Sequence, residues 1–197
     1  MIGSGAATLG LGFPTMCNGA NLAYRKSTYL EVQGFENNFE VASGDDEFLM
    51  RKILQKFPNG ISFLNDKNAV VSTHAQSSIN QFVQQRLRWA GKWKYNSSFS
   101  SQLIALFILT FHISFLVTLE SAIVGTTEVQ LVLAMMGGKL LLEYIFLYRV
   151  NSFLSQPIRP FYFLALQFIY PFYVIVIGFS SQLGRYSWKG RSLAHKL

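Results

Sequence analysis

Two adjacent carboxylates open the most reactive stretch of the chain, Ser43-Gly44-Asp45-Asp46-Glu47. Paired carboxylates in a cleft repel each other, which can raise the pKa of one of them into the range of a general base. The same residues also suit the start of a helix, where acidic side chains interact favourably with the positive end of the helix dipole. Composition alone favours this second interpretation.

A basic and aromatic cluster follows later, Gln85-Arg86-Leu87-Arg88-Trp89. Arginine makes bidentate contacts with phosphate oxygens, tryptophan offers a flat face for a sugar ring, and glutamine both donates and accepts. An equally strong interpretation is an amphipathic helix at a membrane interface, with tryptophan at the headgroup level and arginines on lipid phosphates. The two interpretations are compatible.

A third stretch is rich in turn formers, Cys17-Asn18-Gly19-Ala20-Asn21. Its small residues would let a ligand approach the backbone closely, although a plain turn explains the stretch equally well. Cys17 is the single cysteine, so the chain cannot form an internal disulfide, which fits a reducing compartment. His74 has no second ligand at metal spacing, and we expect no metal site built from this chain alone.

The apolar composition is unevenly distributed. The chain of 197 residues is 50% hydrophobic with a mean hydropathy of +0.26, and most of the excess falls between residues 102 and 181. Three apolar segments there are each near the length of about 20 residues that a membrane-spanning helix needs: Leu103–Val124, Val129–Tyr148 and Phe161–Phe179. We therefore expect three domains or regions, residues 1–101, a transmembrane region 102–181 and a basic tail 182–197.

The net charge of +7 points to the same environment. Many of the basic residues flank the apolar segments, as suits anionic lipid headgroups and cytoplasmic loops. We expect a lipid bilayer as a partner and no nucleic acid.

Periodicity and turn residues predict the remaining elements. We expect a short helix within Arg25–Val32, a helix beginning near Asp45 and ended by Pro58-Asn59-Gly60, and a helix from Ser78 through Trp93. Two short apolar runs, Ile61–Leu64 and Ala69–Ser72, are predicted as strands.

The membrane segments carry three further signals. Lys139 and Glu143 lie four residues apart and should pair on one helix face, and Pro171 should kink or divide the third segment. Basic flanks predict an in, out, in topology, yet a basic tail after a third crossing opposes the positive-inside rule. Three spans, a segment that does not cross, and a hairpin centred on Pro171 all remain open.

Taken in order, these stretches resemble the membrane-bound, inverting family 2 glycosyltransferases, which have the GT-A fold. Residues 17–26 resemble the family's glycine-asparagine segment, Gly34-Phe35 its "GGF" turn, and Gly44-Asp45-Asp46 its "TED" motif. Gln85-x-x-Arg88-Trp89 is similar to "QxxRW", and Trp188-Lys189-Gly190-Arg191 to a tail motif of some members, expected on the cytosolic face.

The resemblance implies a function for each matched residue. Asp46 would be the catalytic base, with Asp45 standing where the family usually has glutamate. The substrate-binding residues would be Asn18, Gly19, Asp45, Gln85, Arg88 and Trp89. Arg88 would contact the donor diphosphate and Trp89 the acceptor. The implied partners are a nucleotide-sugar donor and a glycan or lipid-linked acceptor, with the catalytic part on the cytoplasmic side of the membrane.

One departure from the family is large. The chain has no Asp-x-Asp motif, because Asp45, Asp46 and Asp66 are its only aspartates, and no βαβ pattern precedes residue 17. We therefore expect an α/β fold, a partial GT-A domain without its Rossmann-like half, followed by transmembrane helices. The Mg or Mn ion of the full enzyme would be bound mostly by residues outside this chain, which alone would be incomplete and inactive.

Two functions from other classes remain as alternatives. A non-catalytic membrane protein or degenerate transferase would explain the missing nucleotide-binding half. A small transporter would explain Lys139, Glu143 and Pro171 inside apolar segments, although three segments are few for a transporter.

Overall fold

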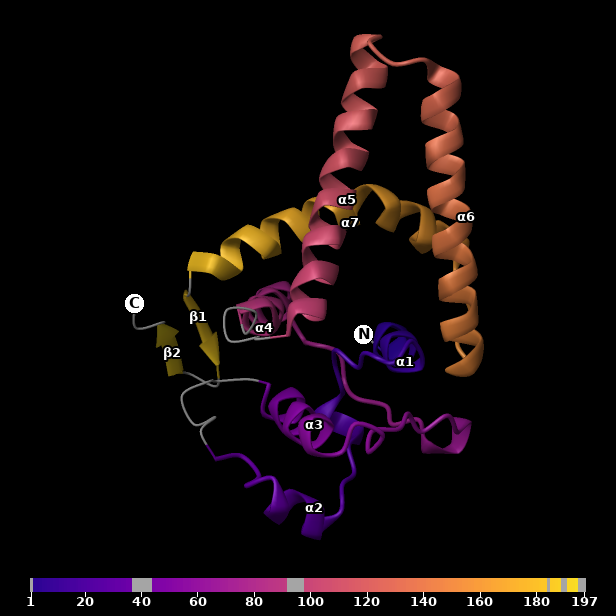
Figure 1. Ribbon diagram of the computed structural model, residues 1–197. Helices are drawn as coiled ribbons and strands as arrows, with labels where there is room; N and C mark the ends of the chain where they lie inside the picture. The colour runs from indigo at the N-terminus through magenta and orange to yellow at the C-terminus, as the bar shows by residue number, and fades with distance from the viewer. Residues whose placement is uncertain (1, 37–43, 92–97, 184, 189–190, 195–197) are drawn as a thin grey trace. The chain divides into compact units, whose positions relative to one another are not determined.

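Helices dominate the computed structural model of the chain, which describes residues 2–36, 44–91, 98–183, 185–188 and 191–194 (Figure 1). The chain divides into two compact units, residues 1–102 with 180–197, and residues 103–179. The predicted α/β class is wrong. The strands among the described residues are two short antiparallel ones in the tail, β1 (Arg185–Trp188) and β2 (Arg191–Ala194), paired from Arg185 with Ala194 to Trp188 with Arg191.

The two predicted strands before the membrane segments are also wrong. Residues 61–66 and 70–76 carry no regular secondary structure, and between them lies a single 3-10 turn, η2 (Lys67–Ala69). Asp66 caps this turn by accepting a hydrogen bond from the backbone N–H of Asn68, at 2.8 Å. A strand needs a neighbouring strand to satisfy its backbone groups, and the described residues supply none to this stretch.

The first unit begins with α1 (Ile2–Gly10), η1 (Gly19–Asn21) and α2 (Lys26–Glu31). It continues with α3 (Asp45–Lys56) and α4 (Ile79–Gly91). The helices predicted near Asp45 and from Ser78 are thereby confirmed. The hydroxyl of Ser78 accepts a hydrogen bond from the N–H of Gln81 at 3.2 Å, as a cap does, while Trp93 lies outside the described residues.

A small apolar core joins α2 and α3. Leu49 and Ile53 on α3 pack with Val32, and half-buried aromatic and aliphatic residues surround them: Tyr29, Phe35, Phe57 and Ile61. Lys52 on the same helix donates hydrogen bonds to the carbonyls of Gly34, at 2.9 Å, and Glu36, at 2.7 Å. These bonds hold the turn after α2 against α3.

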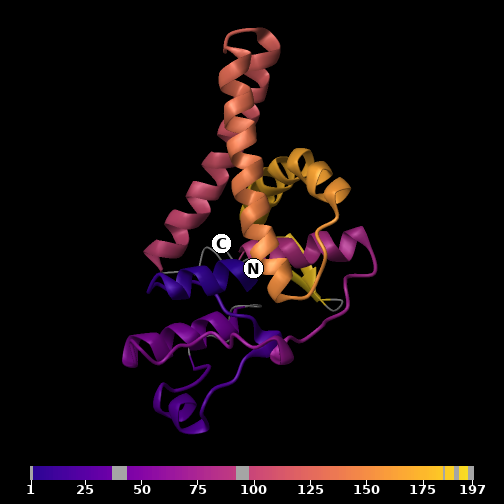
Figure 2. The ribbon, with the colours of Figure 1, turned by 90° about the vertical axis from the view of Figure 1, so that its right-hand side faces the viewer.

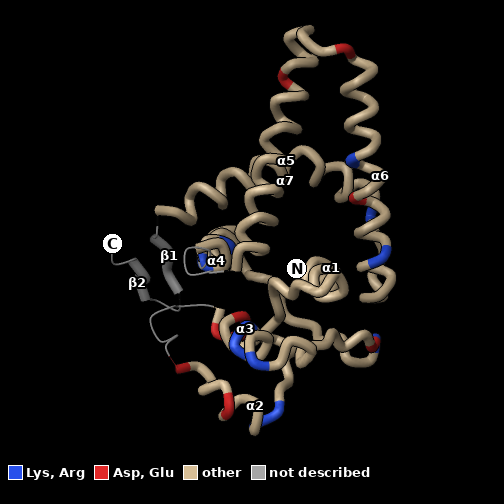
Figure 3. The backbone as a smooth tube through the Cα atoms, viewed as in Figure 1, with Lys and Arg blue, Asp and Glu red and all other residues tan. Residues whose placement is uncertain are grey.

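The second unit is built from three long helices, α5 (Phe99–Val124), α6 (Val129–Phe153) and α7 (Pro160–Ser180). All three, the last extended by η4 (Ser181–Leu183), are long and apolar enough to cross a membrane, which confirms the predicted apolar helices. The 26 residues of α5 reach about 39 Å at roughly 1.5 Å per residue, against a hydrocarbon core of about 30 Å. Charged residues are sparse along these helices (Figure 3).

Helix ends in this unit follow from local sequence. Gly125, with a φ of 78°, ends α5 in the left-handed conformation that glycine adopts without strain. The N–H of Thr126 donates to the carbonyl of Ser121, and that of Gly125 to Ala122, the pattern of a Schellman C-cap. The sequence predicts that Pro171 kinks or divides the third segment. Pro171 does not divide it, because α7 is one continuous helix with Pro171 inside, and this helix is bent in Figures 1 and 2.

A polar cluster links the three long helices. Lys139 on α6 pairs with Glu143 at 2.9 Å, as predicted from their spacing, and also donates a hydrogen bond to the side chain of Gln167 on α7. Its ammonium group lies 4.9 Å from the ring centre of Phe115 on α5. Since Lys139 is buried, these contacts replace the water that the ammonium group would otherwise need.

Candidate active site

The half-buried carboxylate of Asp46 lies in the first turn of α3 and is held at both oxygens. Its Oδ2 accepts a hydrogen bond from the backbone N–H of Gly19, and its Oδ1 accepts one from the N–H of Glu47, each at 2.9 Å. Two N–H donors fix the orientation of the carboxylate plane. Asp45, the neighbouring acid, is exposed at the helix start.

The loop around Gly19 is ordered by its own side chains. The side-chain oxygen of Asn18 accepts a hydrogen bond from the N–H of Ala20, at 3.2 Å, and caps η1. The amide of Asn21 donates to the carbonyl of Ala69 at 2.8 Å, which ties the loop to η2. From the sequence alone, we expect these small residues to let a ligand come close to the backbone. In the structure, the group that comes close to the backbone of Gly19 is the carboxylate of Asp46.

The presence of glycine at position 19 is explained by the space available there. A Cβ there would lie 3.1 Å from Oδ2 of Asp46, closer than such contacts normally are, so the carboxylate would have to move. The structure thus brings together Asn18, Gly19 and Asp46, three of the predicted site residues, across 27 residues of sequence.

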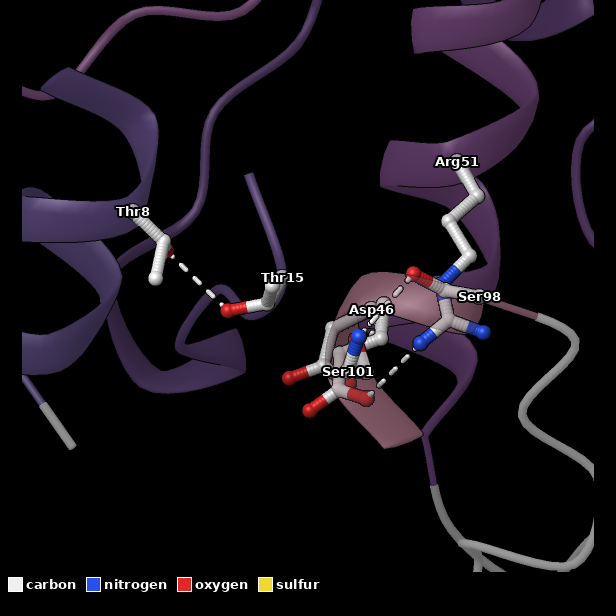
Figure 4. A network of polar contacts seen from close by, with 7 residues as sticks. Thr8, Thr15, Asp46, Arg51, Ser98 and Ser101 are labelled. Atoms are coloured by element: carbon white, nitrogen blue, oxygen red, sulfur yellow. Dashed lines mark hydrogen bonds and ion pairs between the residues drawn. The ribbon is translucent and has the colours of Figure 1, made fainter. Parts of the chain in front are cut away.

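Arg51 is a further charged residue at this place, and sequence reasoning missed it. It lies one turn beyond Glu47 on α3, and its Nη2 forms an ion pair with Oε2 of Glu47 at 3.8 Å. Figure 4 labels the side chains of Arg51 and Asp46. Burial lowers the pKa of the Arg51 guanidinium from its ordinary value, although Glu47 and Cys17 act in the opposite direction. Its spacing of four residues from Glu47 was the available signal.

The other predicted residues, Gln85, Arg88 and Trp89, lie half-buried on α4. Between them the guanidinium of Arg86 stacks on two rings, 4.7 Å from the centre of Phe82 and 4.6 Å from that of Trp89. Such cation–π contacts hold the arginine and the tryptophan in fixed orientations. Helix α4 contacts η4 and β1 in the tail, whereas the side chain of Asp46 accepts its hydrogen bonds from Gly19 and Glu47.

Metal binding by these residues does not fit the structure. Within the described ranges, no three His, Cys, Asp or Glu side chains gather where an ion could be held. A divalent ion needs several oxygen ligands at once, and the pair Asp45 and Asp46 has one member turned into hydrogen bonds with the backbone. We therefore assign no step of the reaction to a metal ion.

Comparison with known families agrees with a membrane enzyme of sugar transfer. The family model described as "Glycosyl transferase family group 2" matches residues 1–177, which is most of the chain. The protein therefore belongs to the family 2 glycosyltransferases, and it carries three candidate membrane-spanning helices. No curated protein and no solved structure matches the chain.

Proposed function

We propose that the protein transfers a sugar from a nucleotide-sugar donor to an acceptor hydroxyl at a membrane, with inversion at the anomeric carbon. The observation that carries this proposal is the hydrogen bond between the Gly19 N–H and the Asp46 carboxylate at 2.9 Å. It joins two of the family-like motifs and presents a carboxylate of fixed orientation beside a loop of small, exposed residues.

The reaction is a single in-line displacement. Asp46 takes the proton of the acceptor hydroxyl, and that oxygen forms a bond to the anomeric carbon as the bond to the diphosphate breaks. The electron pair of the broken bond leaves with the nucleoside diphosphate, whose charge Arg88 stabilises. Trp89 positions the acceptor, and Asn18, Gly19, Asp45 and Gln85 contribute to donor and acceptor binding.

The side of the membrane on which the catalytic part lies, and the metal ion of the enzyme, are also part of this proposal. Arg149 and Arg159 flank the connection between α6 and α7, and the positive-inside rule favours a cytoplasmic location for such a connection. With α5 and α6 as two crossings, the catalytic part is then cytoplasmic as well. The divalent ion implied by the family stays a prediction, with most of its ligands outside this chain.

Substitution Asp46→Asn tests the proposal. The amide keeps the shape of the side chain but cannot accept a proton, so turnover should fall by about 10²–10⁴-fold while donor binding persists. The measurement is incorporation of labelled sugar by membranes that contain the protein, with donor affinity measured by calorimetry. Glu31→Gln is the matched control, since Glu31 is a half-exposed carboxylate paired with Lys56 away from Gly19, and it should leave the rate unchanged.

Several results would contradict the proposal. Wild-type rates in Asp46→Asn would remove Asp46 as the base, and a product that retains the anomeric configuration would remove the inverting mechanism. If no donor or acceptor supports turnover by the wild type, the alternative of a non-catalytic membrane protein replaces it.

A further inference from the structure

The guanidinium of Arg51 has an edge that nothing in the described structure satisfies. Its Nε and Nη2 are buried, and neither has a hydrogen-bond partner within the described residues. The side chain as a whole is 14% exposed. A buried charged donor without an acceptor is costly, because it has given up its bonds to water and gained none in return.

Glu47 does not fill this need. Its Oε2 lies 3.8 Å from Nη2 of Arg51, which is an ion-pair distance but longer than a hydrogen bond. The ring of Phe48, 5.9 Å from the guanidinium, adds only a weak cation–π contact.

The two unsatisfied atoms are neighbours. Nε–H and one N–H of Nη2 point in parallel from one side of the planar guanidinium, and this fork matches the two oxygens of a phosphate or carboxylate group. A single carbonyl or water oxygen can accept from both donors only through a bent, shared hydrogen bond, whereas two paired oxygens accept one straight bond from each donor. The edge therefore fits an oxyanion best, since its negative charge also complements the guanidinium.

We propose that Arg51 is a binding residue for an oxyanion of the substrates, which it holds bidentately through Nε and Nη2 beside the Asp46–Gly19 pair. The location follows from two neighbours. Arg51 lies on the same helix as Asp46, and it is near enough to Cys17 for an electrostatic interaction, while Cys17 directly precedes the Asn18-Gly19 loop.

The source of the oxyanion rests on the proposed function. A nucleotide-sugar donor brings a diphosphate, and an acidic acceptor brings a carboxylate or a phosphate. Both present paired oxygens to the same fork. The experiment therefore uses one probe for each source, inorganic diphosphate for the donor and glucuronate for an acidic acceptor.

The test is calorimetric titration of the full chain in detergent micelles with each probe. Arg51→Lys keeps the positive charge but loses the planar fork, and we expect about tenfold weaker binding of the probe that represents the natural oxyanion. Arg149→Lys is the matched control, because Arg149 is exposed on α6 and lies outside the family-like motifs, and the affinity of this variant should stay within about twofold of the wild type. Far-UV circular dichroism of each variant reports whether its helices are intact.

A second variant keeps the test decisive if Arg51→Lys folds poorly. Glu47→Gln removes the competing carboxylate, 3.8 Å from Nη2, and leaves Arg51 in place, so the same probe should bind more tightly than to the wild type, and an unchanged or weaker affinity would contradict the proposal. If Arg51→Lys weakens the binding of diphosphate, the oxyanion comes from the donor. If it weakens the binding of glucuronate, the oxyanion comes from the acceptor. Equal affinities of wild type and Arg51→Lys for both probes, or no binding of either probe by the wild type, overturn the proposal.

The outcome is separable from that of the proposed function. The same titration on Asp46→Asn should give wild-type affinity, because the base is not a ligand of the oxyanion. If Asp46→Asn retains turnover while Arg51→Lys loses binding, the assigned base is wrong and the oxyanion site stands. If Asp46→Asn loses turnover while Arg51→Lys binds both probes normally, the assigned base is correct and the oxyanion site is wrong.

Discussion

Two cations, the buried Lys139 in the second unit and the half-buried Arg51 in the first, differ in how many partners surround the charged group. Lys139 has Glu143 at 2.9 Å, the side-chain oxygen of Gln167 and the ring of Phe115 around its ammonium group. Arg51 has one acidic neighbour at 3.8 Å and an unsatisfied edge. A cation whose donors are used within the chain supports the structure, whereas a cation with unused donors is available for a ligand.

The difference has an energetic basis. A lysine at the centre of a membrane helix costs about 2.5–3.5 kcal/mol even with the relief that the bilayer allows. The partners of Lys139 come from its own helix and from α5 and α7, so the cost is offset only when the three helices are packed together. The polar cluster is thus a reason for these helices to associate, in a solvent where apolar contacts alone give little preference.

The largest effect is expected from Glu143→Leu. The substitution leaves the buried ammonium of Lys139 without its counter-ion, and breaking a buried pair from one side typically costs about 3–5 kcal/mol. The measurement is the free energy of unfolding in mixed micelles of increasing denaturing detergent.

The matched control is Lys139→Met, which removes the charge and keeps much of the volume. It should cost far less than Glu143→Leu, and the double variant should recover most of the loss, because replacing both partners leaves no buried charge. If Glu143→Leu and Lys139→Met lower the free energy of unfolding equally, the cost of Glu143→Leu does not come from leaving the Lys139 charge unpaired.

Gly19→Ala should affect the site and not the fold. Its Cβ would displace Oδ2 of Asp46, 3.1 Å away, and weaken a charge-assisted hydrogen bond, so we expect about a tenfold loss of kcat, equivalent to about 1.4 kcal/mol. The measurement is the rate of labelled-sugar transfer, together with thermal unfolding.

Gly10→Ala is the control for this variant, because a Cβ at position 10 would meet nothing within 4 Å. It should leave the rate unchanged, and because alanine is a better helix former than glycine, the unfolding temperature should equal that of the wild type or be slightly higher. A Gly19→Ala variant with wild-type kcat would mean that the bond to Gly19 does not orient the base.

Sequence patterns predicted the features that depend on near neighbours along the chain. The helix from Asp45, the three apolar helices and the Lys139–Glu143 pair follow from spacings of three or four residues or from uniform hydrophobicity. The two wrongly predicted strands, Ile61–Leu64 and Ala69–Ser72, fail for the complementary reason. A short apolar run becomes a strand only if another strand lies beside it, and periodicity within the run carries no information about that neighbour.

The same distinction applies to the site. The resemblance to family 2 glycosyltransferases pointed to Asn18, Gly19 and Asp46, but the bond that joins Gly19 to Asp46 spans 27 residues and is visible only in the fold. Gln167 as a partner of Lys139, 28 residues away, was inaccessible for the same reason. Arg51 escaped notice because an arginine four residues from a glutamate is common on exposed helix faces, and only its burial and its unsatisfied atoms distinguish it.

Arg51→Met sharpens the comparison with Lys139 through stability instead of binding. Removing a guanidinium whose edge is unsatisfied should leave the free energy of unfolding within about 1 kcal/mol of the wild type, or raise it. The measurement is unfolding without substrate, compared with Glu143→Leu under the same conditions. A loss as large as that of Glu143→Leu would show that Arg51, like Lys139, is a structural cation.

The smallest effect is expected from Lys56→Ala, which removes the ion pair between Lys56 on α3 and Glu31 on α2. Its N–O distance of 2.9 Å equals that of Lys139 and Glu143, but its side chains are 45% and 49% exposed, against 5% and 34% for the membrane pair. Water solvates both charges in the unpaired state, so the loss should be about 0.2–1 kcal/mol and should shrink as salt is added. Unfolding measured at low and high salt checks both points. A salt-independent loss of several kcal/mol would contradict the argument that burial, and not distance, decides what such a pair contributes.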